Sequence, residues 1–276
     1  MDQISKIIKN FKSFSIPEYL LYETHTENRK LIQTWIEYRK LNCAIPEELK
    51  YFGWKTDKNK CNETPLMLWI KYRNNEAINH KLKYKNWRYD SDACGNTPTM
   101  YWIMYRNNEK IDKDLYYNLF NKDINKLGYT PLMLWIKYRK NEPIPNILKY
   151  AGWQTYKGID KYTPLMLWIK YRNNEPIYKK LKYPNYKTDM CYNTRTPLML
   201  WIKYRTDEPI YEKLKYANYK TDKDKNGYTP LMLWMKYRKG ELICNELLEP
   251  HRNMSEELKY QNYMNDKSNH SRISYK

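Results

Sequence analysis

Glycine, histidine and paired cysteines are scarce in this chain, and their scarcity bears on the chemistry it can carry. The 276 residues include 7 glycines, and none of them forms a glycine-rich phosphate loop. The four histidines lie in unrelated contexts, and the five cysteines form no CxxC pair, which argues against a zinc site. No GxSxG, P-loop or HExxH motif is present. We therefore expect no enzymatic activity, no cofactor and no metal.

Long apolar runs are also missing, and no stretch approaches the length of a transmembrane helix. The N-terminal segment MDQISKIIKNFKSFSIPEYLLY has lysines threaded through its apolar residues, unlike a signal peptide. Free thiols suit a reducing compartment. These features predict an intracellular monomer, cytoplasmic or nuclear, with no membrane span.

Basic and aromatic residues are abundant. The chain holds 50 Lys and Arg against 31 Asp and Glu, a formal charge of +19, together with 30 Tyr and 10 Trp. A charge of this size favours anionic partners without specifying a fold.

The main feature of the sequence is a repeat of 33 residues. The block TPLMLWIKYR begins at Thr64 and returns, with small changes, at Thr97, Thr130, Thr163, Thr196 and Thr229. Such a fixed period predicts stacked units that bury a shared core.

Degenerate copies at both ends suggest the domain boundaries. Residues 31–54 match the unit with one extra residue, IPEYLLY at 16–22 echoes IPEELKY, and residues 254–263 repeat the second half of a unit. We predict an N-terminal cap with a degenerate half-repeat at 1–29, about seven repeats at 30–263, and a polar flexible tail at 264–276. The amphipathic, lysine-bearing N-terminal segment is expected to cover the open end of the stack; the alternative is that it lies on a membrane.

Each unit carries two helix-start signals. Thr followed by Pro, as in Thr64-Pro65, is an N-cap with Pro in the first helical position. The apolar LMLWIKY that follows predicts a helix covered by neighbours on two sides. The second signal is Glu-Pro-Ile, as in residues 142–144, which predicts another short helix opened by Pro. A polar stretch with turn signals, such as Asn226-Gly227, joins one unit to the next.

The period and the Asp-x-Asn-Gly-x-Thr-Pro-Leu opening resemble the ankyrin repeat, with the best match in residues 224–231. The resemblance implies an all-α, ankyrin-like helix–turn–helix solenoid, a single elongated domain with short turn fingers. It also implies a non-enzymatic scaffold or adaptor that binds a protein partner. Two departures concern Met67, where ankyrin units usually have His, and Trp69, where they have Ala. The recurring Trp and Tyr residues are expected in the core, including Tyr72 and Trp87.

Two sets of residues are candidate binding sites. The finger tips differ from copy to copy, and the resemblance places partner contacts there. These candidates are Lys60, Asn62, Cys94, Lys126, Leu127, Asp160, Lys161, Tyr192, Arg195, Lys225 and Tyr228. The second set ends the first helix of each unit: Arg73, Arg106, Arg139, Arg172, Arg205 and Arg238. Each of these arginines has a Glu three residues later, which predicts an ion pair. Alternatively, the stacked Lys/Arg rows with interleaved aromatics bind nucleic acid or another polyanion.

Overall fold

The computed structural model describes residues 52–248, together with Ile32, Gln33, Trp35, Ile36, Glu37, Ile45, Glu47 and Lys50. These residues separate into two compact units, the first ending at Tyr150 and the second beginning at Ala151. The predicted cap at 1–29, the half-repeat at 254–263 and the tail at 264–276 lie outside the described residues.

Helices of eight residues recur at the predicted interval through the described part of the chain. In the first unit these are α4 (Pro65–Tyr72), α5 (Pro98–Tyr105) and α6 (Pro131–Tyr138). The second unit has α7 (Pro164–Tyr171), α8 (Pro197–Tyr204) and α9 (Pro230–Tyr237), followed by the short α10 (Asn245–Leu248). No strand occurs within residues 52–248. The predicted all-α repeat fold is therefore confirmed.

The Thr-Pro pair begins each of these eight-residue helices as predicted. Pro65 is the first helical residue of α4, and the Oγ of Thr64 accepts a hydrogen bond from the N–H of Met67 at 3.4 Å. Because Pro has no N–H to leave unsatisfied, it is tolerated at this position. The same side-chain cap recurs at Thr130, Thr163, Thr196 and Thr229.

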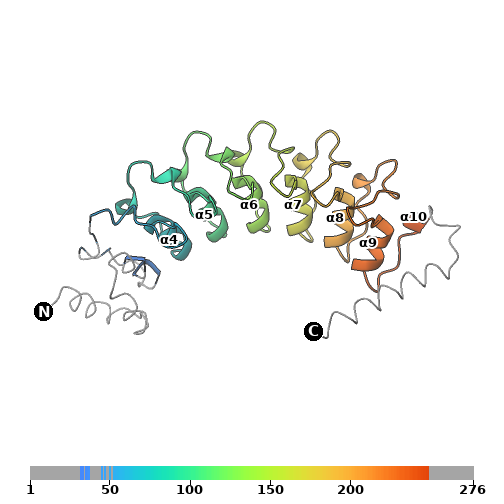
Figure 1. The fold of residues 1–276 in the computed structure, drawn as a ribbon, viewed down its shortest axis with the longest axis horizontal. Coiled ribbons are helices and arrows are strands. Elements are labelled where there is room, and N and C mark those ends of the chain that lie inside the picture. The colour runs from blue at the N-terminus through green and yellow to red at the C-terminus, as the bar shows by residue number, and fades with distance from the viewer. Residues whose placement is uncertain are drawn as a thin grey trace. The chain divides into compact units, whose positions relative to one another are not determined.

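The first helices pack side by side, which explains why they are apolar almost all round. Helix α5 lies between α4 and α6 in the first unit, and α8 lies between α7 and α9 in the second (Figure 1). All residues of α5 from Pro98 to Ile103 are buried. A helix of eight residues is marginal alone, so its stability comes from this burial.

The prediction that Glu-Pro-Ile opens a second helix in each repeat is wrong. The Glu-Pro-Ile region is not helical and leads into a single 3₁₀ turn of three residues. These turns are η2 (His80–Leu82), η4 (Lys113–Leu115), η6 (Asn146–Leu148), η7 (Lys179–Leu181) and η8 (Glu212–Leu214). In η2 the side chain of Asn79 caps the turn, and extended Lys83 ends it. Two apolar residues, Ile78 before this turn and Leu82 within it, are nevertheless buried.

The fingers that join successive repeats are tight turns, each stabilised by an Asp or Asn side chain at the same position. In the second finger, Oδ1 of Asp92 accepts hydrogen bonds from the N–H groups of Cys94 and Asn96, at 2.8 and 2.7 Å. Asn59, Asn125 and Asp224 do the same in their own fingers. Such side-chain-to-backbone bonds stabilise a turn without a strand.

Candidate interaction surface

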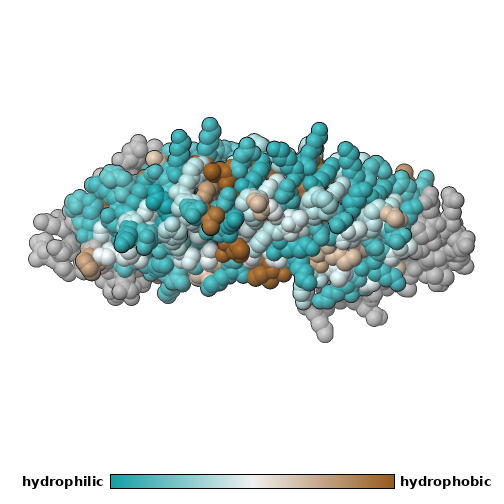
Figure 2. Space-filling model, turned by 90° about the horizontal axis from the view of Figure 1, so that it is seen from above, coloured by the Kyte–Doolittle hydropathy of each residue, from teal (hydrophilic) through white to brown (hydrophobic). Residues whose placement is uncertain are grey.

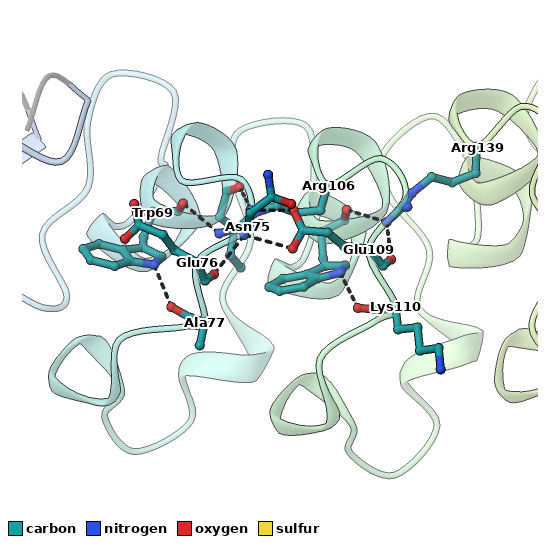
Figure 3. Close-up of polar contacts among 10 residues, drawn as sticks. Trp69, Asn75, Glu76, Ala77, Arg106, Glu109, Lys110 and Arg139 are labelled. Carbon is teal, nitrogen blue, oxygen red and sulfur yellow. Dashed lines mark hydrogen bonds and ion pairs between the residues drawn. The ribbon is translucent and has the colours of Figure 1, made fainter. Parts of the chain in front are cut away.

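The arginine at the end of each first helix is buried, and Arg106, Arg139, Arg205 and Arg238 hydrogen-bond to the preceding repeat. Arg106 has no exposed surface, and its Nε donates to the backbone oxygen of Ile70 at 2.7 Å. Its other nitrogens donate to the backbone oxygens of Trp69 at 3.3 Å and Glu76 at 2.9 Å (Figure 3). The guanidinium also lies 4.6 Å from the centre of the Trp102 ring. The carbonyl groups at the end of α4 thus find donors in the next repeat.

This arrangement recurs in both units. Arg139 donates to the backbone oxygens of Ile103, Trp102 and Glu109 at 2.9, 3.3 and 3.2 Å. In the second unit Arg205 donates to Ile169 and Glu175, and Arg238 donates to Ile202. The arginine is therefore a lateral tie between neighbouring repeats.

The glutamate three residues later completes this tie. Glu109 pairs with Arg106 at 3.2 Å, and its other oxygen accepts from the backbone N–H of Asn75, 2.8 Å away in the preceding repeat (Figure 3). Asn75 has a φ of +63°, a left-handed conformation that Asn tolerates better than most residues. The predicted Arg–Glu ion pair within one repeat is confirmed, and the carboxylate also accepts a hydrogen bond from the preceding repeat.

These contacts correct the prediction of a polyanion-binding arginine row. Exposure is 9% for Arg73, 3% for Arg238 and 0–1% for Arg106, Arg139, Arg172 and Arg205. Burial lowers the pKa of Arg106 and Arg139, although the paired glutamates oppose that shift, and an Arg side chain stays charged in proteins. A buried guanidinium that already binds carbonyls and a carboxylate does not reach a phosphate in solvent. Periodicity identified the row, but only the neighbouring repeat buries it.

Most of the predicted finger-tip residues are exposed. Lys60, Asn62, Cys94, Lys126, Leu127, Asp160, Lys161, Tyr192 and Lys225 all face solvent, and Tyr228 is half-buried. Arg195 is the exception, because its Nε lies 2.8 Å from the buried carboxylate of Asp224. Its assignment to the accessible surface is therefore wrong.

Backbone hydrogen bonds hold neighbouring tips in register. In the first unit the N–H of Lys126 donates to the oxygen of Cys94 at 2.8 Å. In the second unit the N–H of Tyr192 donates to the oxygen of Asp160 at 2.9 Å. The tips therefore present variable side chains on a fixed backbone. Apolar side chains interrupt a mostly hydrophilic face of the molecule (Figure 2).

A second surface feature lies at the C-terminal ends of the first helices. We name it the Lys–Tyr row, and in the second unit it comprises Lys170, Tyr171, Lys203, Tyr204, Lys236 and Tyr237. The lysines are half-buried and their ammonium groups lie over tyrosine rings. In the first unit the equivalent Tyr72 is 37% exposed, so its predicted place in the core is wrong. The recurring dipeptide Lys-Tyr is the sequence signal for this row.

In the first unit, one acidic partner and one substitution interrupt this row. Lys71 forms an ion pair with Glu63 at 3.0 Å, and Met104 occupies the place of the next lysine. Burial would lower the pKa of Lys71, but the hydrogen bond and charge of Glu63 hold that pKa above its ordinary value. The Tyr101 hydroxyl also donates to Glu63 at 2.8 Å. In the first unit, therefore, one position of the row has its charge paired with a carboxylate and another has no cation.

Within the described residues there is no group of three or more His, Cys, Asp or Glu side chains placed to hold a metal ion. None of the described helices is long and apolar enough to cross a membrane. No protein-family model matches the chain, and no curated protein gives a significant match.

Proposed function

We propose that this protein is a non-enzymatic scaffold of ankyrin-type repeats that binds a protein partner through its finger tips. The observation that carries the proposal is that recurring and varying residues of each repeat differ in burial. The recurring residues, such as Trp102 and Arg106, are buried in contacts between repeats, whereas the varying tips are exposed. Packed repeats with exposed, non-repeating tips present a distinct binding surface at modest cost in conformational entropy.

Three features support the ankyrin type: the 33-residue period, the Thr-Pro helix start and the turn fingers. The second helix of the ankyrin unit is reduced to one 3₁₀ turn in these repeats. The tryptophan in place of the usual Ala has a local role, because the indole N–H of Trp102 donates to the backbone oxygen of Lys110 at 3.0 Å. This bond connects the first helix to the non-helical segment before the turn (Figure 3).

The partner is expected to contact apolar as well as charged tips. Leu127 in the first unit and Tyr192 in the second are 57% and 60% exposed, and the ammonium group of Lys225 lies 4.9 Å from the Tyr192 ring. Exposed Leu and Tyr side chains on a fixed backbone are suited to anchor a protein partner.

The test is quantitative affinity capture with a tip variant and a matched control. The tip variant combines Leu127→Ser with Tyr192→Ser, and the control combines Ile147→Ser with Lys180→Ser. The control residues are exposed but lie on the 3₁₀ turns η6 and η7, away from the tips. We expect the tip variant alone to lose the partner. Equal recovery by both variants would show that the tips are not the site.

A further inference from the structure

The lysines at the start of the Lys–Tyr row of the second unit are held in place by aromatic rings. The Lys170 ammonium lies 4.9 Å from the Tyr162 ring centre and 5.0 Å from that of Tyr171. Lys203 lies 4.9 Å from the Tyr204 ring centre, and Lys170 lies 5.8 Å from the same ring. One tyrosine ring is thus shared by the ammonium groups of two successive repeats.

The row continues into the last repeat of the described residues. Lys203 also lies 5.2 Å from the ring centre of Tyr237, and Lys236 lies 4.2 Å from that of Tyr228. The Nζ of Lys236 donates to the Tyr228 hydroxyl at 2.9 Å. Contact with an aromatic face restricts each flexible lysine, so less side-chain entropy remains to be lost on binding.

The positive charges of Lys170 and Lys203 are not paired with a carboxylate in the described part of the chain. Within the described residues, no carboxylate lies at ion-pair distance from Lys170 or Lys203. The buried Arg172 and Arg205 already place positive charge at the same helix ends. The lysines are therefore not needed to offset the negative end of the helix dipole. Residues 151–248 contain 19 Lys and Arg against 10 Asp and Glu. These lysines are therefore available to an acidic group from another molecule.

We propose that the Lys–Tyr row of the second unit binds an extended peptide with a carboxylate at every third residue. This inference rests on the proposed scaffold function and adds the chemistry of the partner. Helices packed side by side are about 8–10 Å apart, which sets the step between lysines. A polyproline II chain has three residues per turn and rises about 3.1 Å per residue, so its every third side chain lies on one face about 9 Å apart. The two spacings match.

The same contacts favour a peptide over a nucleic acid. Single strands bind by stacking bases on open aromatic faces, but these tyrosine rings are already covered by lysine ammonium groups. Tight non-specific binding also requires many phosphate contacts, and the arginines that would extend the row are buried. A peptide carboxylate, by contrast, needs only one ammonium group per repeat.

The experiment measures fluorescence anisotropy of labelled (Glu-Pro-Pro)₅ titrated with the full chain at low salt. One exposed ion pair contributes little, so binding should depend on several lysines together. We expect the double variant Lys170→Gln/Lys203→Gln to weaken binding at least about fivefold. The matched control, Lys180→Gln/Lys213→Gln, removes two exposed lysines from η7 and η8 and should change the affinity less than about twofold. Circular dichroism and thermal melting confirm that both variants fold.

Several outcomes would overturn the proposal. These are no binding by the unmodified chain, an equal loss in the control variant, or equal affinity for an isomeric peptide with its glutamates in one block. Tighter binding of an oligo-dT of the same charge through Lys170 and Lys203 would instead indicate a nucleic-acid site. Capture of a partner through the tips is measured separately, so failure of this proposal leaves the scaffold function standing.

Discussion

The guanidinium of Arg139 donates a hydrogen bond to the backbone oxygen of Ile103, 2.9 Å away near the end of α5. The same group pairs with Glu142 at 3.1 Å, and Glu142 accepts from the N–H of Asn108 at 3.1 Å. Arg139 and Glu142 together therefore connect their own repeat to the preceding one. The residue that looks most like a surface charge in the sequence is an internal part of the stack.

Arg139→Gln is expected to destabilise the first unit by about 3 kcal/mol, because it leaves buried carbonyls and a carboxylate without donors. Arg139→Lys should cost nearly as much, since an ammonium group cannot reproduce the planar fork of donors. Urea denaturation followed by circular dichroism measures both. Lys140→Gln, an exposed change at the next residue, is the control and should stay within about 0.5 kcal/mol. If Arg139→Gln also loses no more than about 0.5 kcal/mol, water replaces the guanidinium.

Asn108, in the turn after α5, should tolerate glycine but not a β-branched residue. Its φ is +63°, and in the last described repeat the equivalent residue is Gly240, with a φ of +86°. Asn108→Gly should therefore leave stability within about 0.5 kcal/mol, whereas Asn108→Val should cost about 1–2 kcal/mol, because a β-branched residue is strained there. Thermal melting compares the two. Equal melting temperatures would show that the turn relaxes to another conformation.

Local signals in the sequence predicted the first helices well, and contacts between repeats account for what they missed. Thr64-Pro65 caps the helix within its first turn, so neighbouring residues in the sequence suffice to predict the helix start. The Pro of Glu-Pro-Ile is compatible with a helix start and with a non-helical segment, and in the structure the chain is not helical until the turn. The burial of Arg106 and the exposure of Tyr72 depend on where the next repeat packs, which no local pattern contains.

Asp123 gives a pH-dependent test in the first unit. Burial raises its pKa from 3.8 to about 6. The folded state thus binds the proton more tightly than the unfolded state, and the stability contributed by Asp123 falls as pH rises from about 4 to 6. Asp123→Asn should therefore stabilise the protein by about 1 kcal/mol at pH 7, a value discounted for partial exposure, and by almost nothing near pH 3.5. Asn retains an acceptor for the Tyr117 hydroxyl.

Asp114, in the same repeat, is the control of opposite sign. Lys83 lowers the pKa of this exposed carboxylate, so its small stabilisation is present at neutral pH and is lost on acidification. Asp114→Asn should therefore slightly destabilise the protein at pH 7. Urea titrations from pH 3.5 to 7.5 measure both variants. The assignment to Asp123 fails if its variant keeps the pH dependence of the unmodified chain.

Removal of one whole repeat tests whether the arginine tie is interchangeable. Deletion of residues 98–130 joins Thr97 to Pro131, which preserves the Thr-Pro cap and places α6 beside α4. Arg139 would then donate to the backbone oxygens of Ile70 and Glu76, as Arg106 does in the full chain. The shortened protein should unfold cooperatively with a smaller dependence on urea, because less surface is buried. Adding Arg139→Gln to the deletion should cost about 3 kcal/mol, as in the full chain, because the tie has the same partners in kind. A folded deletion variant in which Arg139→Gln has no effect would show that the repeats stack there by apolar contacts alone.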